Sequence, residues 1–179
     1  SLHVALNAFS KPELPLFLDL GCGLCTSLLS LSRPRQAIGA AHAPVLGRYN
    51  LLGCDASSLK TAYANGAARR WGTFESTQFA RASAEMTLAS AFSSLASRLA
   101  GVVVQFPTPF RVDGGGNSQL PRLNAHDGSE QQYMLSASLL NEVAVALRDS
   151  KGWFFFQSNV EDVACVARTM TEQTGMELV

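Results

Sequence analysis

The sequence predicts an α/β protein with a doubly wound, mostly parallel sheet and helices on both faces. Short apolar runs alternate along the chain with longer stretches of helical spacing, which is the order found in parallel sheets. The clearest run, 102–106, is continuous in β-branched and aromatic residues, as in a strand covered on both faces. A Gly-x-Gly turn, from Gly21 to Gly23, directly follows the first run. The predicted strands are 16–20, 50–54, 77–82, 102–106 and 153–156.

Five stretches of helical spacing are expected to form helices, at 24–31, 57–71, 86–100, 135–147 and 160–170. Ser57 and Asn159 are expected to cap two of them. The apolar residues that carry the spacing are Leu24, Leu28 and Leu31; Leu59, Ala62, Tyr63 and Ala67; Leu88, Phe92, Leu95 and Leu99; and Leu135, Leu139, Leu140, Val143 and Leu147. Segments 34–48 and 111–130 are expected to form loops, because both contain glycine and proline and lack helical spacing.

One domain, 1–179, accounts for the whole chain. Its 179 residues allow a sizeable core, and 47% apolar with 16% charged residues is a globular composition. Neither an internal repeat nor a linker divides the sequence. The first residue is serine and the last segment, Met176 to Val179, resembles an interrupted strand, which favours a domain truncated at one or both ends.

Composition argues against several classes of function. Four cysteines are too few for a disulfide scaffold, which favours an intracellular protein of the nucleus or cytoplasm. Cys22 and Cys25 have the spacing of a zinc or redox pair, but no second pair accompanies them, so no metal is predicted. No apolar run is long enough to span a bilayer, so no membrane partner is expected. The formal net charge is zero, which does not by itself indicate a nucleic-acid partner.

The first turn is the strongest candidate for a ligand site. A glycine turn after the first strand of a doubly wound sheet lies at the carboxyl edge, where ligands bind. Glycine there lets a ligand approach the bare backbone. A dinucleotide site would have a third glycine where Thr26 stands, and Asp19 would repel a pyrophosphate. The carboxylate of Asp19 instead suits a cationic ligand, such as one that carries a sulfonium and an amino group.

Asp55 ends the second predicted strand, where a carboxylate can accept hydrogen bonds from ribose hydroxyls. Two other interpretations remain open. Asp55 is also suited to cap the helix that follows it. In a rival register the second strand is 37–40 and ends near His42 without an acidic residue. We prefer Asp55, because an apolar run and a capped helix flank it.

These segments resemble the tRNA (guanine-N7-)-methyltransferases, over most of the chain from Leu16 to about Thr174. The first mark, Leu18-Asp-Leu-Gly-Cys-Gly23, is shared by many class I methyltransferases, which are Rossmann-like. The second, Val104-Gln-Phe-Pro-Thr-Pro-Phe110, is similar to the family's Phe-Pro-Asp-Pro-Trp segment and is the more specific. The third, Gln157-Ser-Asn-Val-Glu161, is similar to its Thr-Asp-x-Glu segment.

The resemblance implies an enzyme that uses S-adenosyl-L-methionine to methylate guanine N7 of tRNA, with an accessory protein subunit as a further partner. It implies a catalytic position at Thr108, where the family has aspartate. The residues it implies for the cofactor are Asp19, Gly21, Cys22, Gly23, Asp55, Ala56, Ser83 and Ala84. Those it implies for the substrate are Arg111, Ser158, Asn159 and Glu161.

The departures from the family pattern define two competing hypotheses. Thr108, Asn159 and Ser83 each stand where the family has an aspartate, and the basic run after the Pro-x-Pro turn is nearly absent. A divergent methyltransferase, with a changed substrate or a partner's help, is one interpretation. The other is a binding or scaffold domain that kept the fold and lost the chemistry.

Overall fold

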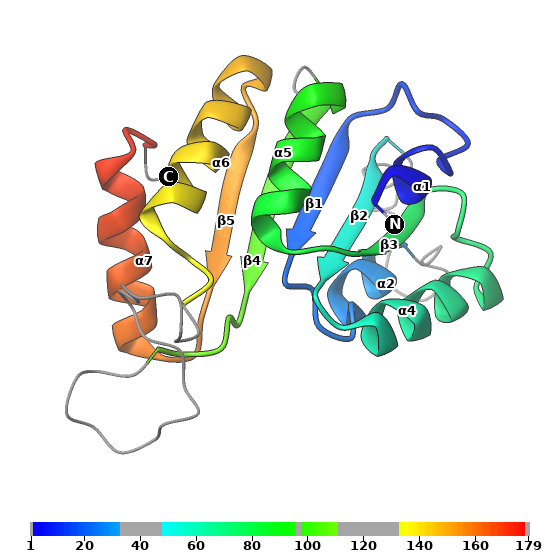
Figure 1. Cartoon of the computed structure of the whole chain (residues 1–179), viewed down its shortest axis with the longest axis horizontal. Helices are drawn as coiled ribbons and strands as arrows, with labels where there is room; N and C mark the ends of the chain where they lie inside the picture. The colour runs from blue at the N-terminus through cyan, green and yellow to red at the C-terminus, as the bar shows by residue number, and fades with distance from the viewer. Residues whose placement is uncertain (1, 33–47, 96–97, 111–132, 178–179) are drawn as a thin grey trace, which may run out of the picture.

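The computed structural model describes residues 2–32, 48–95, 98–110 and 133–177; for residues 90–95 the description covers the backbone alone. Their centre is a five-stranded parallel sheet in the order β3-β2-β1-β4-β5 (Figure 1). The strands are β1 (Leu16–Leu20), β2 (Asn50–Asp55), β3 (Thr77–Arg81), β4 (Leu99–Gln105) and β5 (Trp153–Gln157). All four pairings are parallel, so the predicted fold class is confirmed. The choice of 50–54 as the second strand is confirmed as well.

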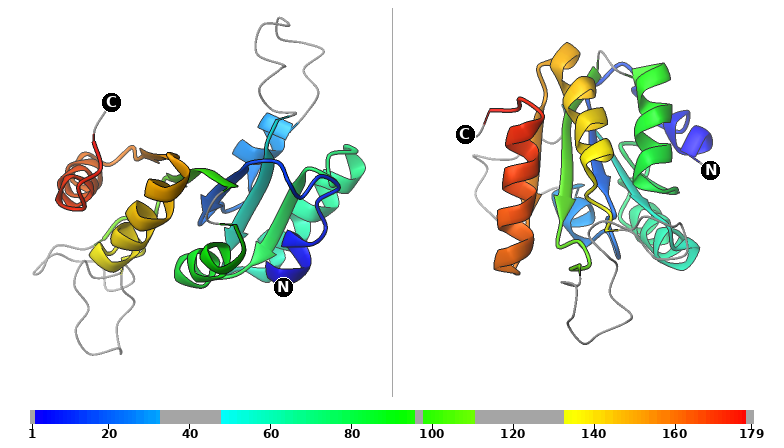
Figure 2. Two further views of the ribbon diagram at one scale, coloured as in Figure 1. Left: turned by 90° about the horizontal axis from the view of Figure 1, so that it is seen from above. Right: turned by 60° about the vertical axis from the view of Figure 1, so that its left-hand side comes forward.

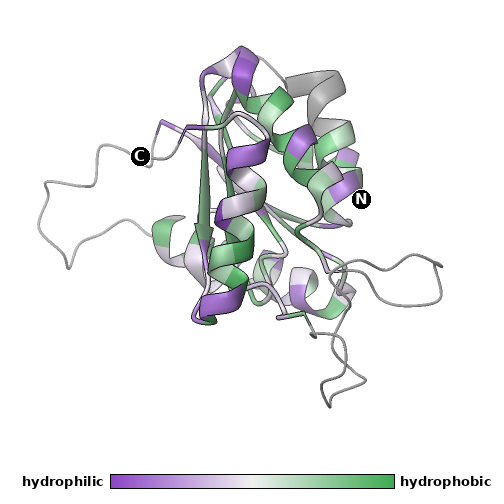
Figure 3. Ribbon diagram, turned by 90° about the vertical axis from the view of Figure 1, so that its left-hand side faces the viewer, coloured by the Kyte–Doolittle hydropathy of each residue, from purple (hydrophilic) through white to green (hydrophobic). Residues whose placement is uncertain are grey.

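Helices cover both faces of this sheet (Figure 2). One face carries α1 (Leu2–Leu6), α5 (Ala84–Leu95), α6 (Ala137–Ser150) and α7 (Glu161–Gln173). The other carries α2 (Thr26–Ser32) and α4 (Ser58–Arg70), which pack on β2 and β3. Figure 3 shows the strands coloured mostly as hydrophobic, whereas the helices carry both colours. No helix in the described ranges is long and apolar enough to cross a membrane.

The larger core lies beneath α5, α6 and α7. Alternation along the strands sends Leu18 and Leu20 of β1 and Val102 and Val104 of β4 to this face, where all four are fully buried. The predicted stripe of α6 is confirmed, because its leucines and Val143 are buried there. Ser136 caps α6 by accepting a hydrogen bond from the backbone N–H of Leu139 at 3.1 Å.

The predicted inner faces of α2 and α4 were right only in part, because Leu28 is buried and Ala67 is partly buried against the core, whereas the other predicted residues are exposed. Leu28 and Leu29 are the buried residues of α2, while Leu24 and Leu31 are 55% and 39% exposed. In α4 the buried residues are Thr61, Ala64 and Ala68, and the predicted Leu59 and Tyr63 are exposed. These small inward residues let α4 lie close to the sheet.

Several boundaries also differ from the predictions. α2 begins at Thr26 instead of 24, because Cys25 has a φ of 59° that no right-handed helix accepts. α5 ends at Leu95, and Leu99 already belongs to β4. α7 is preceded by Val160 without a side-chain cap, so the expected cap at Asn159 is wrong. The predicted loops 34–48 and 111–130 lie almost wholly outside the described residues.

β5 is the edge of the sheet and is covered on one face, whereas an unbroken apolar run such as 153–156 is typical of a strand covered on both faces. Phe154 and Phe156 pack against the larger core, whereas Trp153 and Phe155 are 49% and 42% exposed on the opposite side. Trp153 contacts Phe17 of β1 across β4, with ring centroids 4.7 Å apart. The strand between them carries only a glycine at this point, which leaves room for the two rings.

Candidate functional site

The order of the strands defines where a ligand can bind. After β1 the chain crosses to β2 through α2 on one face, and after β4 it crosses to β5 through α6 on the other. The connections therefore diverge at the carboxyl ends of β1 and β4, which are neighbouring strands. In open α/β sheets ligands bind in the crevice at such a switch point. The candidate site is built at this edge.

The glycine turn lies directly after β1, at the carboxyl edge of the sheet. Gly21 and Gly23 have φ values of 71° and 58°, which a residue with a Cβ adopts only with strain. The backbone N–H groups of Gly21 and Cys22 donate to the Cys54 carbonyl oxygen at 2.8 and 3.0 Å, so the turn is fixed to β2. A Cβ at Gly23 would meet no described atom within 4 Å, so the backbone there faces open space.

Asp19 lies beneath this turn and is 2% exposed. Its Oδ1 atom has no hydrogen-bond partner in the described part of the chain. Burial raises the pKa of Asp19 from 3.8 to about 7, because the charged carboxylate is poorly solvated there. An unpaired buried carboxyl is costly unless a cation or a donor approaches it. Asp19 is therefore the group at this edge that most needs a partner.

Asp55 joins the turn to the end of β2. Its Oδ2 accepts a hydrogen bond from the Gly23 N–H at 3.0 Å, and its Oδ1 accepts one from the Ser57 N–H at 2.8 Å. The ammonium group of Lys60 lies 3.8 Å from Oδ2. The cap of α4 is Ser57, as predicted, whose Oγ accepts from the Lys60 N–H at 3.4 Å. Asp55 is therefore not the cap of α4; it ties the glycine turn to the segment after β2.

The remaining cofactor candidates, Ala56, Ser83 and Ala84, lie after β2 and β3. Ser83 is half-buried, and its Oγ accepts a hydrogen bond from the Met86 N–H at 3.2 Å in the first turn of α5. Ala84 is buried at the start of the same helix, and Ala56 is exposed directly after β2. The Ala82 N–H donates to the Asp55 carbonyl oxygen at 3.2 Å. The structure therefore brings these candidates to the same edge as the glycine turn.

The segment after β4 lies at the same edge of the sheet, beside the end of β1. Gln105 accepts a hydrogen bond from the Ser27 hydroxyl at 2.6 Å, which links the end of β4 to the first turn of α2. The Phe106 N–H donates to the Gln157 carbonyl oxygen at 2.8 Å. Phe106 itself has a φ of 49° and is 54% exposed. Thr108 is exposed two residues further on.

The substrate candidates after β5 lie near the start of α7. Ser158 is half-buried, and its Oγ accepts a hydrogen bond from the Val160 N–H at 3.1 Å. Asn159 and Glu161 are exposed, and Glu161 lies in the first turn of α7, where a negative charge is favoured. Arg111 lies outside the described residues.

Three features of the edge were not predicted. The Ser27–Gln105 hydrogen bond joins residues 78 positions apart, so no local pattern signals it. The strained backbone of Phe106 has no sequence signal either. Met134, just before α6, covers the turn, since a Cβ at Gly21 would lie 3.0 Å from its Sδ.

The thiols of Cys22 and Cys25 interact with each other beside the glycine turn. A hydrogen bond with the Cys25 thiol, followed by burial, raises the pKa of Cys22 and keeps it a thiol. Within the described ranges, no group of three or more His, Cys, Asp or Glu residues could hold a metal ion.

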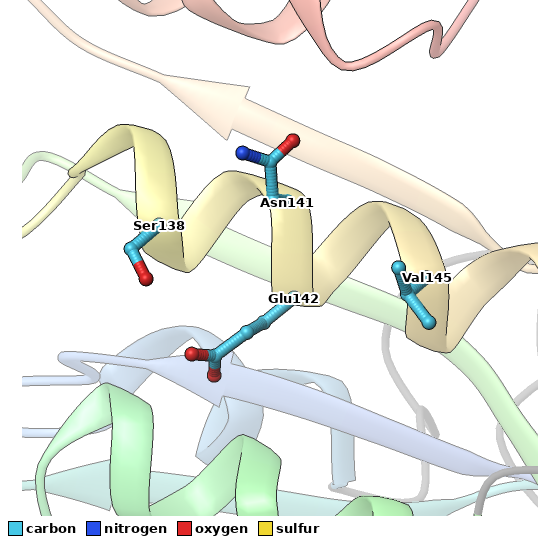
Figure 4. A pocket seen from close by; sticks show the side chains of 4 residues that line it. All are labelled: Ser138, Asn141, Glu142 and Val145. Carbon is cyan, nitrogen blue, oxygen red and sulfur yellow. The ribbon is translucent and has the colours of Figure 1, made fainter.

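A separate groove of about 460 Å³ lies along α6, lined by Ser138, Asn141, Glu142 and Val145 (Figure 4). All four described lining residues belong to that one helix. Their side chains point in different directions, so they do not converge on one ligand. The groove therefore carries no functional assignment.

Comparison with solved structures identifies the fold as that of the class I methyltransferases. A precorrin-6y C5,15-methyltransferase from Geobacter metallireducens GS-15 matches with a TM-score of 0.50 and 11% identity, over 97% of this chain and 70% of its own. A precorrin 8W decarboxylase from Methanobacterium thermoautotrophicum matches with 0.53 and 12%, over 92% and 64%. A SAM-dependent methyltransferase from Agrobacterium tumefaciens matches with 0.54 and 11%, over 97% and 48%.

At these identities the likeness concerns the fold. The chain spans between 48% and 70% of the length of these three proteins. No protein-family model matches the sequence, and no curated protein matches it.

Proposed function

We propose that this chain binds S-adenosyl-L-methionine at the carboxyl edge of its sheet and transfers the methyl group to guanine N7 of tRNA. The observation that carries the cofactor is Asp19, a buried carboxyl with an unpaired oxygen beneath a glycine turn at the switch point. The fold shared with class I methyltransferases supports it. The acceptor is proposed from the resemblance of the three sequence segments to the tRNA (guanine-N7-)-methyltransferases.

The residues at this edge fit the cofactor. Its amino group and sulfonium are cationic, which matches the unpaired Oδ1 of Asp19. Its ribose hydroxyls are donors, and the Asp55 oxygens keep free lone pairs beyond the two backbone hydrogen bonds they accept. The open space above Gly23 lets a ligand lie directly on the backbone. Cys22 and Ala56 flank these contacts, and Ser83 and Ala84 would lie on the adenine side.

The methyl transfer requires little from the protein beyond positioning the methyl donor and the acceptor. When bound, the cofactor supplies a methyl group on a positively charged sulfur. The N7 lone pair of guanine forms the new N–C bond while the C–S bond breaks, and that electron pair stays on sulfur. No proton leaves N7, so no general base is required, and alignment accounts for most of the rate. Thr108 can therefore act by hydrogen-bonding the acceptor, although it lacks the charge of an aspartate.

Calorimetric titration with S-adenosyl-L-methionine tests the cofactor site. We expect binding by the parent chain, and weaker binding by Asp19→Asn and by Asp55→Asn. Asp149→Asn, at an exposed carboxylate on α6, is the matched control and should bind as the parent does. Absence of heat at millimolar cofactor would refute the proposal.

Transfer of a tritiated methyl group to tRNA tests the acceptor. The parent chain should label a tRNA transcript, with and without an added partner subunit. A transcript made with 7-deazaguanosine has no N7 and should stay unlabelled. Equal labelling of both transcripts would rule out N7 as the acceptor and favour a methyltransferase with another substrate.

A second candidate function is a binding or scaffold domain without catalysis. It is favoured by the side chains at positions 108, 159 and 83, which are uncharged in this chain. The double variant Thr108→Asp and Asn159→Asp separates the two. Labelling of tRNA that appears only in this variant would support a domain that lost its chemistry. Labelling by the parent chain would exclude it.

A further inference from the structure

Phe106 combines two costly features at the carboxyl edge of the sheet. Its φ of 49° lies in the left-handed region, which is a real outlier for a bulky side chain. The residue before a proline is normally extended, and Pro107 follows it, so the strain is compounded. Its aromatic side chain is also 54% exposed to solvent. Such outliers persist where the surroundings impose them, and they gather at ligand sites.

The surroundings of Phe106 hold its backbone in this conformation. Its N–H donates to the Gln157 carbonyl oxygen at 2.8 Å, which ties it to the end of β5. The preceding Gln105 accepts a hydrogen bond from the Ser27 hydroxyl at 2.6 Å, which ties it to α2. Hydrogen bonds to the end of β5 and to α2 therefore fix the backbone that carries the Phe106 ring. A core contact does not explain this arrangement, because more than half of the side chain faces water.

Phe106 follows β4 at the switch point, close to where a methyl acceptor would bind. The glycine turn after β1 and Phe106 after β4 follow the carboxyl ends of neighbouring strands. A methyl acceptor must come within about 3–3.5 Å of the methyl group, in line with the bond that breaks. It must therefore occupy the space between a cofactor on the glycine turn and the segment after β4. Among the described residues of that segment, 106–110, Phe106 is the large apolar side chain with the most exposure.

We infer that Phe106 is the platform on which the planar heteroaromatic ring of the methyl acceptor stacks. The inference rests on the proposed function and adds the recognition of the acceptor to it. A ring stacked on Phe106 presents its in-plane nitrogen lone pair sideways, parallel to the aromatic face. The exposed polar side chains at the ends of β5 and α7, Gln157 and Asn159, are available to hydrogen-bond its edge.

The charge that moves in the reaction strengthens this contact. The acceptor ring is neutral at the start and carries a positive charge once its nitrogen has formed the N–C bond. An aromatic face attracts a cation through its quadrupole. The Phe106 ring thus binds the charged, methylated ring more tightly than the neutral one, and part of that gain is already present in the transition state.

Titration with two mononucleotides tests the platform directly. Guanosine monophosphate represents the neutral ring, and 7-methylguanosine monophosphate the charged one. With S-adenosylhomocysteine present, the parent chain should bind both, and the methylated one more tightly. Phe106→Leu keeps an apolar side chain but removes the aromatic face, and should weaken both by about 5- to 100-fold. Phe106→Trp, with a larger face, should keep or improve the affinity.

The matched control is Phe155→Leu, which removes an aromatic side chain that is 42% exposed on the outer face of β5. It should bind both mononucleotides as the parent does. Equal losses in Phe155→Leu and Phe106→Leu would overturn the inference, and so would a parent chain that binds neither mononucleotide. In the transfer assay, Phe106→Leu should raise KM for tRNA and lower kcat, whereas a merely structural role would lower the thermal midpoint.

Titration of the same variants with S-adenosyl-L-methionine separates this inference from the proposed function. Phe106→Leu should bind the cofactor as the parent does. If it loses cofactor and keeps mononucleotide affinity, the ring contacts the sulfonium and the inference is wrong. If the parent binds no cofactor, the proposed function fails, whereas the mononucleotide titrations still report on Phe106. Phe106→Gly, which removes ring and strain together, should fold and lose both mononucleotides.

Discussion

Replacing Asp19 with asparagine is expected to change how the free energy of unfolding depends on pH. Burial raises the pKa of Asp19 from 3.8 to about 7, and its Oδ1 has no partner in the described part of the chain. In the unfolded chain the same carboxyl is solvated and titrates near its ordinary pKa. Between the two pKa values, the folded state holds a proton that the unfolded state has released. The free energy of unfolding therefore falls as the pH rises through this window.

The size of the effect follows from the two pKa values. Each pH unit between them is worth about 1.36 kcal/mol. Over the whole window the contribution of Asp19 amounts to about 4 kcal/mol. Between about pH 5 and about pH 8 it amounts to about 2–3 kcal/mol, since protonation is incomplete at both ends. The asparagine side chain of the variant does not titrate, so the difference in stability between parent and variant should change by that amount.

Urea unfolding followed by tryptophan fluorescence measures this at several pH values between 5 and 8. Asp149→Asn serves as the control, because it removes an exposed carboxylate of α6 and should leave the pH dependence parallel to that of the parent. Parallel curves for the parent and Asp19→Asn would refute the reasoning, since they would mean that the buried carboxyl has the same proton affinity in both states.

Three further substitutions test the packing and the helix ends, each by urea unfolding. Gly101→Ala should lower the free energy of unfolding by about 1–3 kcal/mol, because its Cβ would lie 2.9 Å from the Phe17 ring and 3.2 Å from Trp153. An unchanged free energy of unfolding would mean that the two rings move apart freely. Lys151→Gly should raise the free energy of unfolding by about 0.5–1 kcal/mol, because Lys151 ends α6 with a φ of 53°. A lower free energy of unfolding would show that the Lys151 side chain matters more than its backbone. Ser136→Ala should cost about 1 kcal/mol by removing the cap of α6, and a variant as stable as the parent would contradict that role.

The strands were predictable because their signal is local. Each of the five apolar runs became a strand, and the glycine turn after the first is where the chain reverses into α2. The inner faces of α2 and α4 were not predictable in the same way. Helical spacing marks a possible apolar stripe, but the close approach of α4 to the sheet selects small residues such as Ala64 and Ala68 for the buried side. Leu59 then points to solvent.

The exposed aromatic face of β5 is a second feature that the local sequence did not predict. An unbroken run such as Trp153 to Phe156 predicts a strand covered on both faces. Whether both faces are covered depends on the position of the strand in the sheet and on where the helices lie. β5 is an edge strand, and α2 and α4 pack over β2 and β3, so Trp153 and Phe155 stay partly exposed.

By itself the sequence determined that Asp19, Gly21, Gly23 and Asp55 lie at one edge of a parallel sheet, because each ends or follows a strand. Only the tertiary structure decided which hydrogen-bond partners these groups have and which of their atoms stay unpaired. The unpaired Oδ1 of Asp19 results from burial by distant segments, and the hydrogen bond that Asp55 accepts from the Gly23 N–H joins residues 32 positions apart. The strained backbone of Phe106 is held by the end of β5. Burial and strain depend on residues brought together from across the chain, and a local pattern does not contain them.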